Sequence, residues 1–132
     1  MVTTASPVSA AAAISLGPVG LSPLSVFGCS GFVFGASFNV IVVSSGLDLT
    51  VDSMTVHMID GTSLGGPSVT IPSPQLNAQF GTTIVRAGTS RVFPLHPVFG
   101  CTARRPQFLA ATVLVVDRRG RSQTMDAKAE VQ

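Results

Sequence analysis

Apolar residues recur at every second position in several stretches of this chain, which is the period of a β-strand with one buried face. In residues 32–43 the side chains that share one face are Phe32, Phe34, Ala36, Phe38, Val40 and Val42. In residues 121–131 polar and charged side chains alternate with Gln123, Met125, Ala127, Ala129 and Val131. These two runs predict long strands that each cover a hydrophobic core with one face.

Turn residues separate the alternating runs at strand-length intervals, as in an all-β sandwich. The expected strands cover residues 21–27, 32–43, 47–59, 68–71, 82–86, 91–95, 108–116 and 121–131. Ser73 as N-cap, Pro74 at the first position and Gly81 at the end predict one short helix over residues 75–80. Within residues 47–59 the apolar phase slips by one between Val51 and Met54, which predicts a β-bulge or two shorter strands.

A chain of 132 residues fits a single domain. Residues 1–20 consist of serine, threonine, alanine, proline and glycine with scattered aliphatic residues, and they carry no charge. Pro7 and Pro18 bracket the short alanine run too closely for a stable helix. We therefore expect a flexible or extended arm over residues 1–20, followed by the sandwich domain over residues 21–132.

The tetrapeptide Val-Phe-Gly-Cys occurs twice, at residues 26–29 and 98–101, and each copy carries one of the two cysteines. Two cysteines outside a CxxC pair are either buried free thiols or a disulfide. In an Ig-type strand order, residues 32–43 and 108–116 run the same way in opposite sheets, and Cys29 and Cys101 then lie at one end. We expect a Cys29–Cys101 disulfide. Its loop spans 72 positions, which predicts about 4 kcal/mol of stabilisation.

Residues 113–120, VLVVDRRG, precede a polar-alternating last strand, and residues 86–91 read RAGTSR. Both segments resemble bacterial immunoglobulin-like and fibronectin-III-like modules, over roughly residues 20–132. The resemblance implies an Ig-like antiparallel β-sandwich of about seven strands with one short helix. The chain departs from antibody-type domains because it lacks the core Trp and the corner Tyr, and because its cysteines precede the central strands. Such modules are mostly non-enzymatic surface, adhesion or spacer units.

Charge is scarce and unevenly placed along the chain. Charged residues make up 11%, against 45% hydrophobic residues, and residues 1–47 contain none. All eight basic residues follow position 85, but the net charge is only +2. Nucleic-acid binding normally needs a larger and more concentrated basic excess. We expect no nucleic-acid partner, and instead a protein, a polysaccharide or a second copy of the chain.

Three patterns that suggest chemistry have simpler explanations. Residues 61–65 match G-x-S-x-G, but a nucleophile elbow requires a strand–turn–helix in an α/β sheet, so a glycine-rich turn is expected. His57 and His96 have no nearby pair of acidic residues, and an edge or surface position is expected for both. Asp48, Asp52 and Asp60 do not form a calcium-loop pattern. We therefore expect no catalytic, metal or cofactor site, and no enzyme.

The arginines form two sets at opposite ends of the expected strand 108–116. Arg104 and Arg105 precede it, and Arg118, Arg119 and Arg121 follow it, roughly 35 Å away at about 3.3 Å per residue. Solvated loop charges are the simpler interpretation. The functional interpretation is that Arg118, Arg119 and Arg121 contact an acidic protein or a polysaccharide.

These features favour a non-enzymatic Ig-like module that acts in binding, adhesion or spacing at a secreted or cell-surface location. The apolar stretch in residues 10–16 is too short for a transmembrane span, and export of the chain is expected. The alternative is a self-assembling, fibre- or pilus-like structural subunit. In that case the uncharged arm would add a strand to the open sheet edge of a neighbouring copy.

Overall fold

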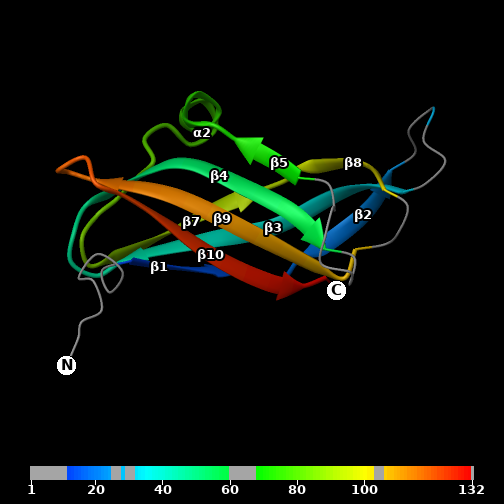
Figure 1. Ribbon diagram of the computed structural model, residues 1–132, viewed down its shortest axis with the longest axis horizontal. Coiled ribbons are helices and arrows are strands. Elements are labelled where there is room, and N and C mark those ends of the chain that lie inside the picture. Colours follow the sequence, from blue (N-terminus) through cyan, green and yellow to red (C-terminus); the bar gives the residue numbers. More distant parts are fainter. Residues whose placement is uncertain (1–11, 25–27, 29–31, 60–67, 103–105, 132) are drawn as a thin grey trace.

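The computed structural model describes residues 12–24, 28, 32–59, 68–102 and 106–131. In this part the chain is all-β: two antiparallel sheets pack face to face, and one short helix lies beside them (Figure 1). The sheet that contains β3 is called sheet I, and the sheet that contains β4 is called sheet II. Sheet II is nearer the viewer in Figure 1.

Sheet I is built around one long central strand, β3 (Phe32–Ser44). Along one side of β3 lie β1 (Ala12–Leu16) and β2 (Gly20–Leu24), one after the other. Along its other side lie β7 (Thr89–Leu95) and β8 (Val98–Thr102). All four neighbours run antiparallel to β3, so sheet I is three rows wide.

Sheet II is four rows wide and also antiparallel. Its order is β10 (Ser122–Glu130), β9 (Phe108–Asp117) and β4 (Leu49–Ile59). The other side of β4 pairs with β5 (Ser68–Ile71) near its end and with β6 (Ile84–Val85) near its start.

The expectation of about seven strands was too low, because the described residues form ten strands in seven rows. Three rows are each divided in two. Gly17-Pro18 separates β1 from β2, and Pro97 separates β7 from β8. A proline cannot donate to the ladder, although the carbonyl of Pro97 still accepts a hydrogen bond from the N–H of Ala36 at 2.9 Å. The helix lies between β5 and β6 in the chain.

The described part of the expected N-terminal arm belongs to the sandwich. β1 pairs with β3 over five residues, Ala12↔Ser44 to Leu16↔Val40. Val19 is fully buried in the core and forms a parallel bridge with Val131. The expected boundary at residue 20 therefore lies inside the folded unit, because the alternating aliphatic residues find a partner strand in their own chain. Residues 1–11 lie outside the described residues.

The inner faces of the sheets supply the core, and the alternation predicted for β3 and β10 is confirmed. From β3 the buried side chains include Phe34, Ala36, Phe38, Val40 and Val42. The predicted bulge in β4 is also confirmed. Its register with β9 shifts between Val51 and Ser53, so Asp52 has no opposite residue and points to solvent.

The helix α2 (Ser73–Phe80) starts two residues earlier than expected. Pro72 is the N-cap and Ser73 is the first helical residue, so the prediction of Ser73 as N-cap was wrong. Gly81 ends the helix with a φ of +75°, a conformation that glycine adopts without strain. Leu76 anchors the helix in the core, and the ring of Phe80 packs edge-on against Phe93.

The second Val-Phe-Gly-Cys copy lies in a strand, and of the first copy only Gly28 is described. Gly28 has a φ of +91°, whereas Val98–Thr102 is an extended strand, β8, paired with β3. Cys101 thus lies within a strand of sheet I and not in a connection ahead of β9, which corrects the expectation. β3 and β9 do run the same way in opposite sheets (Figure 1). Cys29, and with it the expected disulfide, lies outside the described residues.

Candidate functional site

The turn between β9 and β10 is organised by the carboxylate of Asp117, whose side chain is only 4% exposed. Its Oδ1 accepts hydrogen bonds from the backbone N–H groups of Arg119 at 2.8 Å and Arg121 at 3.0 Å. Its Oδ2 accepts a third from Nε of Arg121 at 3.0 Å. Gly120 completes the turn with a φ of +80°. One carboxylate therefore fixes the backbone that carries all three arginines.

Two aspartates at this end of the sandwich are held in the charged form. Burial raises the pKa of Asp117, but the hydrogen bonds from Arg121 and Arg119 outweigh burial and lower it. The pKa of Asp48 is lowered chiefly by the backbone N–H of Ala87, which donates to it at 2.8 Å, and further by Arg86 and Arg118. Both carboxylates therefore remain ionised around neutral pH.

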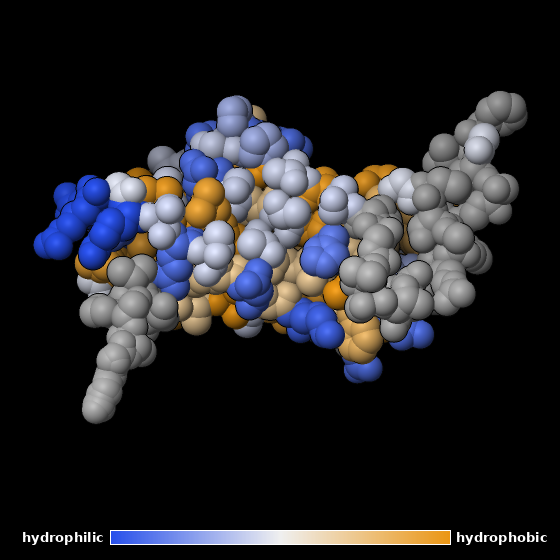
Figure 2. Space-filling view, viewed as in Figure 1, coloured by the Kyte–Doolittle hydropathy of each residue, from blue (hydrophilic) through white to orange (hydrophobic). Residues whose placement is uncertain are grey.

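A hollow of about 220 Å³ opens at this end, lined by Asp48, Thr50, Ile84, Arg86, Asp117 and Arg118. Within the described residues, Arg86 pairs with Asp48 at 3.4 Å and Arg121 pairs with Asp117. The guanidinium groups of Arg118 and Arg119 donate no hydrogen bond to a described residue. Four arginines and two aspartates at this end leave an excess of positive charge, and Figure 2 shows strongly hydrophilic residues gathered at the left end of the molecule. Two guanidiniums on a fixed turn can bind carboxylate or sulfate groups in bidentate fashion.

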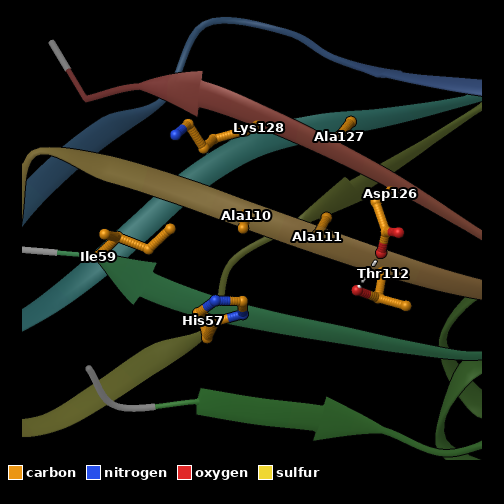
Figure 3. Close-up of a pocket in the computed structure, with 8 residues that line it drawn as sticks. All are labelled: His57, Ile59, Ala110, Ala111, Thr112, Asp126, Ala127 and Lys128. Atoms are coloured by element: carbon orange, nitrogen blue, oxygen red, sulfur yellow. Dashed lines mark hydrogen bonds between the residues drawn. The ribbon is translucent and has the colours of Figure 1, made fainter. Parts of the chain in front are cut away.

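A second, shallower hollow lies on the outer face of sheet II, and its central residue is Ala110 (Figure 3). The strand register places His57 on one side of Ala110 and Lys128 on the other. Because the central side chain is a single methyl group between longer ones, the face is indented there. The volume is about 410 Å³, enough for a small polar ligand or a side chain of a partner.

Three of the polar groups around this second hollow already have partners. Thr112 Oγ1 donates to Asp126 Oδ1 at 2.7 Å, and Nζ of Lys128 lies 4.5 Å from the centre of the Phe108 ring. His57 and Lys128 stand two strand spacings apart, about 10 Å. That separation is too long for direct proton transfer between them. The arrangement suits binding better than acid–base chemistry.

The structure separates the other residues singled out in the sequence. His57 lines the sheet II hollow, whereas exposed His96 lines a different cavity of about 270 Å³ beside β5, α2 and β8. Asp48 belongs to the turn end, and Asp52 points to solvent at the bulge. Within the described ranges, no three His, Cys, Asp or Glu side chains gather as they would around a metal ion. Asp60, the 61–65 segment, Arg104 and Arg105 lie outside the described residues.

Two polar residues with structural roles were missed in the sequence. Thr83 is buried, and its Oγ1 donates to the carbonyl of Val51 at 2.8 Å, directly beside the bulge. Arg91 donates to the carbonyls of Phe80 and Ile84, each at 3.2 Å, and its guanidinium lies 4.9 Å from the ring centre of Phe93. Arg91 shares the inner side of β7 with Phe93, and this alternation was the available signal.

Comparison with known proteins establishes the fold and nothing narrower. No protein-family model and no curated protein sequence matches this chain. A solved structural-genomics target, SoR45, is similar over 92% of this chain and 82% of its own, with a TM-score of 0.61 and 10% identity. The putative ApaA protein from Bordetella pertussis is 12% identical over 91% of this chain and 90% of its own, with a TM-score of 0.45. The second likeness is too distant to support an argument.

No helix among the described residues is long and apolar enough to cross a membrane.

Proposed function

We propose that this protein is a non-enzymatic Ig-like module of an extracytoplasmic surface, which binds an acidic protein or polysaccharide through its β9–β10 turn. The observation that carries the proposal is the Asp117-centred turn, which uses one carboxylate to fix three arginines and leaves Arg118 and Arg119 facing outward. A fixed backbone lowers the entropy lost when the guanidiniums engage a partner.

The order of the rows supports the Ig-like assignment. Counted by rows along the chain, β3 is second and β9 is sixth, and they run the same way in opposite sheets. The first, second and fifth rows form sheet I, and the others form sheet II. In the constant-type Ig order the fourth strand joins the sheet of the first, second and fifth. Here the fourth row, β5 and β6, pairs with the third, β4.

Binding to two polyanions, immobilised heparin and poly-glutamate, tests the proposed site. We expect Arg118→Ala/Arg119→Ala to weaken binding at least about tenfold, because each lost arginine removes charge-assisted hydrogen bonds. Moderate salt should weaken the wild-type interaction as well.

Arg104→Ala/Arg105→Ala is the matched control, because it removes the same charge from the segment that precedes β9 in the chain, whereas Arg118 and Arg119 follow β9. We expect this control to bind both polyanions as the wild type does. Equal losses in the two double variants would show that net charge alone governs binding, and the proposal would then fail. Retention on heparin with no binding to poly-glutamate would assign the site to polysaccharides.

The extracytoplasmic assignment makes a separate prediction about the cysteines. A disulfide between Cys29 and Cys101 is expected in an oxidising compartment. Alkylation of the native protein followed by non-reducing mass spectrometry measures it directly. Two alkylated cysteines in protein taken from its native compartment would contradict both the disulfide and this localisation.

A second candidate function is self-assembly by strand exchange, with β1 leaving its own β3 to pair with β3 of another copy. The observation that favours it is that β1 is a five-residue, uncharged edge strand that pairs with β3 in sheet I. Its Ala12, Ile14 and Leu16 also pack against the core, so a neighbouring copy would have to offer an equivalent apolar surface. Deletion of residues 1–16 tests it. An assembly that forms unchanged without β1 would rule out strand exchange.

A further inference from the structure

The described strands of sheet I place no charged side chain on their outer face. Among the residues of its five strands, Arg91 is the single charged one, and it lies on the inner side with Phe93. Four of the five large hydrophobic residues exposed in the described structure lie on this outer face: Leu24, Val43, Val92 and Val98. Val92 and Val98 are 50% and 57% exposed. A contiguous uncharged surface with exposed aliphatic groups is typical of a protein interface.

The register of sheet I gives this face an internal symmetry about its middle. Ile41 of β3 lies beside Val92 of β7. Gly35, which lies as far from the midpoint of β3 on the other side, is beside Val98 of β8. Ser37 and Asn39, both exposed, occupy the centre. The face therefore has an apolar group at each end and a small polar group between them.

We propose that this face is the interface of a homodimer in which two copies of sheet I pack face to face with their β3 strands antiparallel. The two-fold axis lies in the plane between the two sheets, perpendicular to β3, and passes over β3 midway between Ser37 and Asn39. A second copy of the chain fits this face, because a two-fold rotation places the apolar end of one copy against the opposite apolar end of the other.

Three pairings follow from that rotation and from the strand register. Val92 of one copy meets Val98 of the other, so the two most exposed hydrophobic side chains cover each other. Ile41 meets Gly35, a large side chain over a residue with none. The central serines and asparagines meet across the axis, where their side chains can hydrogen bond between copies.

The size of the face fits a weak but specific dimer. β3 has 13 residues, about 43 Å of strand, and three rows span about 14 Å, so each copy can bury about 600 Å². The total of about 1,200 Å² is the lower limit for stable interfaces. Sheets packed this way lie about 10 Å apart at about −30°. This proposal does not depend on the arginine turn, which lies at the end of the sandwich.

Sedimentation velocity of the full chain at up to about 100 µM tests the proposal, a concentration suited to micromolar association. We expect a concentration-dependent species of about twice 13.5 kDa. Val92→Glu should yield monomer, because each glutamate would face Val98 of the partner without a counter-charge. Thr124→Glu adds the same charge at an exposed position on the outer face of sheet II and should leave the dimer intact.

A charge pair then tests the register. Val92→Glu/Val98→Lys should restore the dimer, since each glutamate would meet a lysine of the other copy. Within one copy, positions 92 and 98 stand about 20 Å apart along their row, so they cannot pair there. Wild-type monomer at about 100 µM, or dimer that persists in Val92→Glu, would overturn the proposal. A double variant that remains monomeric would overturn the antiparallel arrangement. Circular dichroism checks that each variant is folded.

Discussion

The two sheets have similar inner faces and very different outer faces. On the inside, both present buried aliphatic and aromatic side chains, such as Phe93 in sheet I and Met54 in sheet II. On the outside, sheet II presents Asp126, Lys128 and Glu130 from β10, together with hydroxyl pairs such as Thr55 and Thr70 at 3.2 Å. Among the described strands of sheet I, no charged side chain lies on the outer face.

This difference separates the requirements of folding from those of the surface. An inner face must be apolar in both sheets because each forms half of one core. An outer face in water needs no particular apolar residue, and charges there suppress unwanted association. Sheet II follows that pattern, and sheet I does not. Folding therefore does not account for the uncharged outer face of sheet I, whereas a partner that covers this face would account for it.

The largest effects are expected where the two sheets are alike. Phe93→Ala in sheet I should lower the free energy of unfolding by about 3–5 kcal/mol, and Met54→Ala in sheet II by about 2–5 kcal/mol, because each leaves a cavity in the core. The outward controls Ser90→Ala and Thr124→Ala should change it by about 0.5 kcal/mol or less. Urea unfolding measures all four. A small effect of Phe93→Ala would contradict the placement of the Phe93 side chain in the core.

The sequence predicted the parts of this fold that depend on alternation. The buried faces of β3 and β10 and the bulge in β4 follow from the spacing of apolar residues, and all three are confirmed. The division of rows by Pro18 and Pro97 was missed, because a long strand can pair with two short ones and no local pattern shows this. The role of β1 was missed for the same reason.

The candidate sites were less predictable. The Arg118–Arg121 cluster was visible as a charged turn, but its organisation by Asp117 depends on backbone N–H directions that the sequence does not show. The hollow around Ala110 brings together residues from three strands, so it needs the register of β4, β9 and β10. Alternation could have shown the uncharged outer face of sheet I once its five strands were known.

A smaller effect is expected at the bulge in β4, which interrupts the register between β4 and β9. Thr83→Val keeps the shape of the side chain but removes the hydroxyl that donates to the carbonyl of Val51. The buried acceptor loses a partner, so the free energy of unfolding should fall by about 1–3 kcal/mol. Thr50→Val is the exposed control, with an expected change of about 0.5 kcal/mol or less. Equal values for the two variants would assign no structural role to the Thr83 hydroxyl.

The charged end of the molecule should make stability depend on acid pH. The pKa of Asp117 is lowered in the folded state, so its contribution is fully present above the ordinary aspartate value of about 3.9 and is lost as the pH falls through the folded value. Asp117→Asn should lower the urea midpoint at pH 7. The difference from wild type should shrink at pH 3, because protonation of Asp117 in the unfolded chain below about 3.9 already favours unfolding of the wild type. A constant difference at both pH values would contradict an ionised Asp117 in the folded protein.

The smallest effect concerns the outer faces themselves. On sheet II, Thr112 and Asp126 form a cross-strand hydrogen bond, and on sheet I, Ile41 and Val92 occupy the equivalent neighbouring positions. Double-mutant cycles with alanine should give coupling energies of about 0.2–1 kcal/mol for each pair. High salt should reduce the first coupling, because its acceptor is a carboxylate, and should leave the second unchanged. Zero coupling between Ile41 and Val92 in the monomer would mean that these side chains stand apart on the surface, and their contacts would then have to come from the partner copy.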